Sequence, residues 1–217
     1  MSRRLIMMRH GQTTYNAGRR MQGQLDTQLS DAGLAQAHAA AEWVKGMGIV
    51  KIVSSDLSRA SATAEIIGEK LGLEVELDPR LRETHLGDWQ GMTHEEVDGA
   101  YVGARAAWRH DPAWTPPGGE SRLDVAERAR PVVDKLLQWE GWDDAAVLLV
   151  AHGGTISALT SKLLDLEHAQ YPLLKSLDNT NTSQLYARPR MGGDGSWDDV
   201  QWYLEAWNQG ALSLIHI

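Results

Sequence analysis

The chain has 217 residues, of which 42% are hydrophobic, with 21 Lys and Arg against 29 Asp and Glu. This composition is typical of one soluble globular domain and excludes disorder and collagen-like repeats. The net charge of −8 argues against a nucleic-acid partner, because such proteins present a clustered basic surface to the phosphates. A small anion is still a suitable ligand.

The sequence also limits location and covalent chemistry. No apolar run approaches the roughly 20 residues of a membrane helix, and the run at 5–8 is too short for a signal peptide. We therefore expect a cytoplasmic protein with no membrane contact. The absence of cysteine excludes disulfides, thiolate metal sites and a Cys nucleophile.

Strands and helices are predicted to alternate along the whole chain. Short apolar runs indicate buried strands at 5–8, 50–53, 75–77 and 146–151. Amphipathic segments predict helices at 30–47, after 54–56 up to Gly68, at 121–140 and after Gly154 up to Leu164, the first with Ser30 as N-cap. Later strands are expected at 182–187 and 200–204. This alternation predicts a three-layer α/β/α sandwich with a mainly parallel central sheet.

Two segments fall outside this alternation. The stretch 88–121 is rich in Trp, Gly and Pro, and we interpret it as a cap over the site within a single domain of residues 1–211. Residues 212–217 read like the translation of a sequencing adapter, which predicts a non-native tail. His216 therefore receives no role.

Groups suited to phosphate follow successive predicted strands. Arg9 and His10 end the first strand, Arg59 follows the second, Glu83 the third, and His152 the strand at 146–151. Taken singly, each is more often a surface cation, a solvated acid or a hydrogen-bonded loop histidine. Because ligands bind beyond the carboxyl ends of parallel strands, their recurrence there predicts one site.

The chemistry of such a site follows from the residue types. Two Arg side chains and helix N-termini can hold a phosphate dianion and stabilise its charge during transfer. A neutral imidazole can then act as nucleophile, while a second, protonated by the nearby phosphate, adds to the anion site. Glu83 is the candidate to protonate the leaving oxygen and then activate water.

The stretch 5–16, with Arg9-His10-Gly11, resembles the signature of the histidine phosphatase superfamily, in its phosphoglycerate-mutase-like branch. The resemblance extends to about Asn208 through Ser54-Ser55-Asp56, Arg59, Glu83, Gly119-Glu120-Ser121 and His152-Gly153-Gly154. It implies His10 as the phosphorylated nucleophile, Arg9, Arg59 and His152 as the phosphate pocket, and Glu83 as proton donor, with no metal or other cofactor. By the same resemblance, the substrate is contacted by Asn16, Gln22, Gly23 and Gly153.

The stretches 21–27, 80–91, 103–109 and 118–122 are similar to a bacterial subgroup that dephosphorylates glucosyl-3-phosphoglycerate on the way to methylglucose lipopolysaccharides. Such a substrate carries a carboxylate and a sugar besides its phosphate, which calls for an extra cation and an aromatic or polar wall. The candidates are His85, Trp108, Arg109, Trp114 and Arg122. For most of the tryptophans, packing of the cap is the favoured role.

Several alternatives stay open. A mutase would return the phosphoryl group to a bound phosphoglycerate, and a phosphatase of the same family could act on many phosphomonoesters. A metallohydrolase would use His94, Glu95, Glu96 and Asp98, although this run lacks the second His of a zincin motif. A non-catalytic phosphoester-binding or protein-interaction module is a third class. Ala-rich helix faces and the Trp-rich segment also allow a homodimer.

Overall fold

The sheet is the frame of the molecule. The computed structural model describes residues 2–192 and 195–211, and within them six strands form one sheet in the order β3-β2-β4-β1-β5-β6. Four neighbouring strands are parallel, β5 pairs antiparallel with β1, and β6 pairs antiparallel with β5 at the edge. The strands are β1 (Arg3–Arg9), β2 (Ile49–Ser54), β3 (Val75–Leu77), β4 (Ala146–Ala151), β5 (Thr182–Pro189) and β6 (Val200–Gln209).

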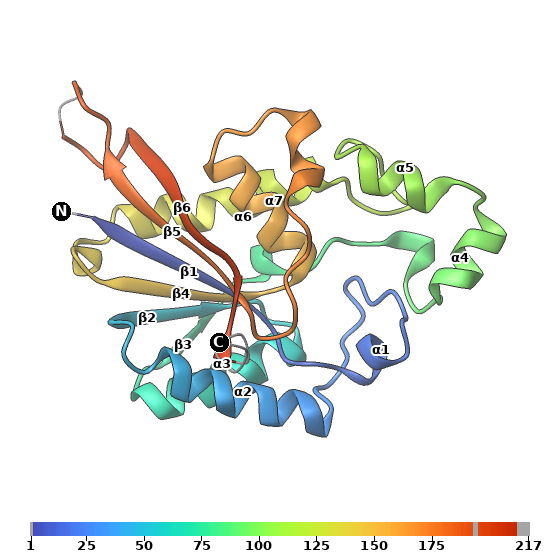
Figure 1. The fold of residues 1–217 in the computed structure, drawn as a ribbon, viewed down its shortest axis with the longest axis horizontal. Coiled ribbons are helices and arrows are strands. Elements are labelled where there is room, and N and C mark those ends of the chain that lie inside the picture. The colour runs from blue at the N-terminus through green and yellow to red at the C-terminus, as the bar shows by residue number, and fades with distance from the viewer. Residues whose placement is uncertain (1, 193–194, 212–217) are drawn as a thin grey trace, which may run out of the picture.

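Helices cover both faces of the sheet (Figure 1). α2 (Asp31–Val44) and α3 (Ser58–Leu71) lie on one face, and α6 (Arg122–Leu137) and α7 (Gly153–Leu163) lie on the other. Alternate residues of β1 supply the two cores, with Leu5 in one and Ile6 in the other. Burial on both faces explains the continuous apolar run, and the predicted three-layer sandwich with a mainly parallel sheet is confirmed.

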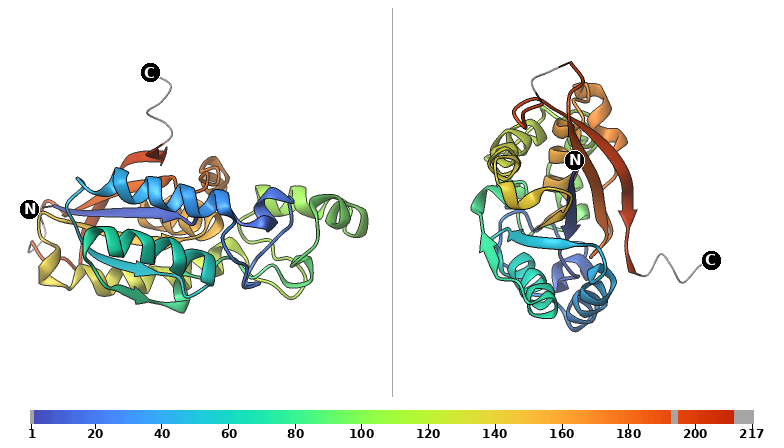
Figure 2. Two further views of the ribbon diagram at one scale, coloured as in Figure 1. Left: turned by 90° about the horizontal axis from the view of Figure 1, so that it is seen from below. Right: turned by 90° about the vertical axis from the view of Figure 1, so that its left-hand side faces the viewer.

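Shorter elements gather at one end of this frame. α1 (Thr14–Ala17), α4 (His94–Ala100) and α5 (Ala104–His110) lie beyond the carboxyl end of β1 (Figures 1 and 2). The described residues also contain short 3₁₀ helices: η1 (Pro79–Leu81), η2 (Gly87–Trp89), η3 (Glu140–Trp142) and η4 (His168–Leu173). Around η2, the buried Trp89 packs with Trp108 and Trp114 in a separate apolar cluster.

Local interactions set the helix ends. The predicted cap Ser30 accepts a hydrogen bond from the Gly33 N–H at 3.1 Å and starts α2. The expected helix 30–47 ends at Val44, and the expected helix 121–140 ends at Leu137. β6 runs to Gln209 rather than 204, because its pairing with β5 extends that far.

Two expectations concern other parts of the chain. The predicted non-native tail, residues 212–217, lies outside the described residues. Within residues 2–192 and 195–211, no helix is long and apolar enough to cross a membrane.

Candidate active site

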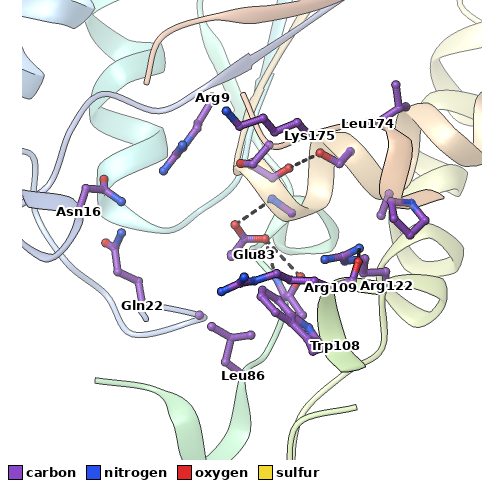
Figure 3. A pocket seen from close by; sticks show the side chains of 18 of the residues that line it. Arg9, Asn16, Gln22, Glu83, Leu86, Trp108, Arg109, Arg122, Leu174 and Lys175 are labelled. Atoms are coloured by element: carbon purple, nitrogen blue, oxygen red, sulfur yellow. Dashed lines mark hydrogen bonds between the residues drawn. The ribbon is translucent and has the colours of Figure 1, made fainter. Parts of the chain in front are cut away.

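A cavity of about 670 Å³ opens beyond the carboxyl ends of β1 and β4. Figure 3 shows Arg9, Asn16 and Gln22 on one side of it and Trp108, Arg109 and Arg122 on the other, with Glu83 between them. The structure thus brings together groups that lie far apart in the sequence. The predicted site residues that line the cavity are Arg9, His10, Asn16, Gln22, Gly23, Arg59, Glu83, Arg109, Arg122 and Gly153.

His10 directly follows β1 and is 3% exposed. Its Nδ1 lies 2.7 Å from the carbonyl oxygen of Gly11. Because a carbonyl only accepts, Nδ1 must carry the hydrogen of a neutral ring, and Nε2 keeps its lone pair. Burial, together with the charges of Arg59 and Arg9, holds the pKa of His10 well below its usual value. The ring is therefore neutral at neutral pH and can act as a nucleophile through Nε2.

Arg59, in the first turn of α3, is 1% exposed and is held by backbone oxygens. Its Nη1 donates to Leu25 O and its Nη2 to Gly23 O, both at 2.8 Å. Burial lowers the pKa of Arg59 to about 10, which leaves the guanidinium charged at neutral pH. Arg9 is held in the same way by Leu177 O. Among the described residues neither Nε has a partner, so both side chains retain donors for an anion.

Glu83 is held at the N-terminus of α7. Its carboxylate accepts from the backbone N–H groups of Gly154 and Thr155, each at 3.1 Å, and from that of Thr84 at 2.8 Å. A Cβ at position 154 would lie 2.5 Å from Glu83 Oε1, closer than any side chain tolerates. Gly154 therefore permits the helix to approach the carboxylate.

His152 directly follows β4 as the N-cap of α7 and is fully buried, with its ring centroid 5.2 Å from that of His10. Its Nε2 lies 2.9 Å from Ser55 Oγ. Burial, with the charges of Arg59 and His10, holds the pKa of His152 well below its usual value. The protein environment thus favours a neutral ring, and the protonation expected from the sequence requires the negative charge of a substrate.

Asn16 and Gln22 face the cavity with their amide nitrogens (Figure 3). The Asn16 Oδ1 accepts from the Thr13 N–H at 3.0 Å, and the Gln22 Oε1 accepts from the hydroxyls of Thr13 and Thr27 at 2.9 and 2.5 Å. With the oxygens engaged, the NH₂ groups remain as donors. Both side chains thus favour an anion.

The opposite wall combines cations with apolar surface. The Arg122 guanidinium lies 5.1 Å from the Trp108 ring centroid, and its Nη1 donates to Arg109 O at 3.2 Å. Tyr171, Leu174 and Lys175 also line the cavity, with Lys175 between Arg9 and Leu174 in the view of Figure 3. The wall is long enough to contact a group much larger than phosphate.

Two proposed substrate contacts lie elsewhere. His85 is absent from the cavity lining, because its Nδ1 turns to the Gly87 N–H at 3.2 Å. Trp114 packs against Trp89 with ring centroids 5.3 Å apart, as expected for a tryptophan of the apolar cluster. The structure does not bring either residue into the cavity.

The alternative metal site is not assembled. The Glu96 carboxylate caps α4 at the Thr93 N–H, and Asp98 pairs with Arg105. Throughout residues 2–192 and 195–211, no group of three or more His, Asp or Glu side chains is placed to hold a metal ion. Of the four residues proposed for that site, only His94 lines the cavity.

Arg128 is a site residue that sequence reasoning missed. From the middle of α6 it donates to Glu83 O at 2.9 Å and to Arg80 O at 2.7 Å, and it pairs with Glu120 at 2.9 Å. These bonds hold the segment that carries Glu83. The sequence held one indication of this role. Arg128 lies three residues after the core residue Val125, so a charged side chain falls on the inward face of the helix.

Comparisons with known proteins agree with this geometry. Residues 5–209 match the profile of the histidine phosphatase superfamily (branch 1). The glucosyl-3-phosphoglycerate phosphatase of Mycolicibacterium vanbaalenii is 54% identical over 215 residues, covering 96% of each chain. The probable phosphoglycerate mutase of Yersinia pestis is 37% identical over 179 residues, covering 76% of this chain and 77% of the relative.

The solved structures include a close relative. The structure of a mycobacterial glucosyl-3-phosphoglycerate phosphatase in complex with VO3 is 51% identical in sequence, with a TM-score of 0.88. The match covers 96% of this chain and 100% of that chain. The chain is therefore similar to this phosphatase in both sequence and fold along nearly its whole length.

Proposed function

Because the chain belongs to the histidine phosphatase superfamily, we propose that it hydrolyses phosphomonoesters through a phosphohistidine at His10, with glucosyl-3-phosphoglycerate as substrate. The observation that carries the proposal is the buried His10 ring, whose Nδ1 is committed to Gly11 O while Nε2 is free to attack. Arg9 and Arg59 line the same cavity and supply the positive charge that a phosphoryl group requires.

In the first step His10 Nε2 attacks phosphorus as the bond to the ester oxygen breaks. The two guanidinium groups, with the amides of Asn16 and Gln22, stabilise charge on the phosphoryl oxygens. Glu83, in its protonated form, delivers a proton to the departing alkoxide. The step yields a free alcohol, phosphohistidine and the Glu83 carboxylate.

In the second step water attacks phosphorus and the P–N bond breaks. The Glu83 carboxylate takes a proton from the water, so that inorganic phosphate and neutral His10 are regenerated. The hydrogen bonds from α7 hold the carboxylate in place through both steps. One acid thus serves both halves of the reaction.

The choice of substrate is supported by the far wall and by the relatives. The cavity of about 670 Å³ is much larger than a phosphate, and Arg109 and Arg122 line it on the side opposite Asn16 and Gln22 (Figure 3). These cations suit the carboxylate of a phosphoglycerate, and Trp108 suits the apolar face of a sugar. We infer that the segment 88–121 acts as the cap over this part of the cavity.

Metal independence belongs to the same proposal, since the two arginines and the N-terminus of α7 provide the positive field within the protein itself. A cytoplasmic location and assembly as a homodimer stay predictions of the sequence.

A panel of phosphomonoesters tests the proposal: glucosyl-3-phosphoglycerate, mannosyl-3-phosphoglycerate, 3-phosphoglycerate and p-nitrophenyl phosphate. We expect the highest kcat/KM with glucosyl-3-phosphoglycerate. Equal kcat/KM values across the panel would instead indicate a broad-specificity phosphatase. The similarity to the probable phosphoglycerate mutase of Yersinia pestis is the reason to test the mutase alternative. Release of phosphate without a bisphosphoglycerate primer would indicate hydrolysis rather than mutase activity. No turnover of any ester would favour a binding module.

A further inference from the structure

Ser55 directly follows β2, and its hydroxyl has two hydrogen-bond partners among the described residues. The residue is 0% exposed, and its Oγ accepts from the Leu57 N–H at 3.3 Å and lies 2.9 Å from His152 Nε2. The Leu57 N–H uses one of the two lone pairs of this oxygen, and the hydroxyl hydrogen still requires an acceptor of its own. A buried O–H is almost always hydrogen-bonded. Among the described residues, His152 Nε2 is the acceptor within reach.

An Nε2 that accepts a hydrogen bond carries no hydrogen, so the neutral ring must carry it on Nδ1. This Nδ1 is buried and has no hydrogen-bond partner among the described residues. A buried N–H without an acceptor is unfavourable unless a ligand supplies one. The His10 ring lies beside it, with the centroids 5.2 Å apart, so a phosphoryl group held at His10 borders the His152 ring.

We propose that Ser55 is a positioning residue that fixes the tautomer of His152, so that Nδ1–H donates to an oxygen of the phosphoryl group held beside His10. The opposite tautomer would turn a lone pair toward the anion and repel it. In the neutral ring, which burial favours before an anion binds, only the nitrogen that already carries its hydrogen can donate. The inference rests on the proposed function only in placing an anion at His10.

The tautomer can be measured directly in the folded full-length protein. With ¹⁵N-labelled histidine, NMR distinguishes protonated from unprotonated ring nitrogens, and His152→Gln identifies the His152 signals among the eight histidines. We expect protonated Nδ1 and unprotonated Nε2 in the wild type. Protonated Nε2 with unprotonated Nδ1 would overturn the proposal, whatever the activity of the enzyme. This measurement also decides the question if the Ser55 variant does not fold.

Ser55→Ala then tests the cause. We expect loss of the single tautomer and binding of inorganic phosphate weakened by about 10- to 100-fold, the scale of a hydrogen bond to a charged group. Ser54→Ala is the matched control, because Ser54 is also fully buried but donates to Ser55 O and Val150 O. It should leave the tautomer unchanged and phosphate affinity within about twofold.

An unchanged His152 spectrum in Ser55→Ala, or equal weakening of phosphate binding by both serine variants, would overturn the role of Ser55. A fixed tautomer that Ser55→Ala disrupts, in a protein that hydrolyses no phosphomonoester, would instead overturn the proposed function and leave this inference standing.

Discussion

The cavity has two halves that are built differently. Around His10, side chains are buried and tied to backbone oxygens at strand ends, as Arg59 is to Gly23 O and Leu25 O. On the far wall, Arg109 belongs to the short helix α5 beyond the sheet, and Arg122 rests on a tryptophan ring. The sheet thus positions the groups around His10. Of the groups proposed for selectivity, Arg109 sits on a short helix that can vary without disturbing the sheet, whereas Arg122 starts α6, which packs on it.

The most direct way to break this comparison is to remove the nucleophile. His10→Ala should lower kcat/KM by about 10⁴-fold or more and abolish ³²P labelling of the protein by substrate. Because a phosphoramidate is labile to acid and stable to alkali, the wild-type label should be removed by acid. His38→Ala, on the exposed face of α2, is the control. Label persisting in His10→Ala would refute the assignment.

The next test concerns the acid. Glu83→Gln should slow phosphorylation of His10 by about 10²–10⁴-fold with an alkyl phosphate, which needs protonation of a poor leaving group. With p-nitrophenyl phosphate the same step should slow much less, since p-nitrophenolate leaves without help. Single-turnover measurement isolates this step from hydrolysis of phosphohistidine. Equal slowing with both substrates would show that Glu83 orders the pocket rather than donating the proton.

Burial of the imidazoles predicts a dependence of stability on pH. Unfolded histidine titrates near pH 6.5, whereas the folded pKa of His152 lies well below its usual value. As pH falls below about 6.5, the unfolded chain binds a proton that the folded chain does not, so the free energy of unfolding decreases. Each such group contributes up to about 1.4 kcal/mol per pH unit.

Urea unfolding at pH 7, 6 and 5 measures this dependence. His152→Gln should make the loss of stability between pH 6.5 and 5 less steep, and His38→Gln should leave its slope unchanged. A slope equal to that of the wild type in His152→Gln would argue that the buried ring is protonated in the folded state.

The far wall should respond differently. Arg122→Met keeps most of the apolar stem against Trp108 but removes the charge, so KM for glucosyl-3-phosphoglycerate should rise by about tenfold, as for one charge-assisted hydrogen bond. Turnover of p-nitrophenyl phosphate should change by less than about twofold. Arg130→Met on the same helix, where Arg130 pairs with Asp134, is the control. An equal loss of kcat/KM with both substrates would show that Arg122 does not act on substrate selectivity separately from the groups around His10.

The smallest effect is expected from metal removal. Exhaustive chelation should leave kcat within about twofold, because the positive field comes from Arg9, Arg59 and the N-terminus of α7. A large loss of kcat that zinc or magnesium restores would show that a bound cation, rather than these side chains alone, supplies the positive charge.

The sequence predicted the residues around His10 better than those of the far wall, for a physical reason. Arg9, His10 and His152 stand where buried apolar runs stop, and parallel strands bring such ends together, so local patterns were enough. His85 and Trp114 are proposed because a substrate with a sugar and a carboxylate calls for such side chains, but the turn at Gly87 and the packing on Trp89 direct them elsewhere. Arg128 was missed because its partners are the backbone oxygens of Arg80 and Glu83, which no side-chain motif reveals.

The place of β1 in the sheet affects how the enzyme is made. His10 is synthesised well before its neighbours in the sheet, because β1 pairs with β4 and β5, whose residues follow more than 130 positions later. A nascent chain therefore carries the proposed nucleophile without the strands that bury it until β4 and β5 have been made. The proposed site forms only after these distant pairings close, so we expect the growing polypeptide to lack activity until β5 has left the ribosome.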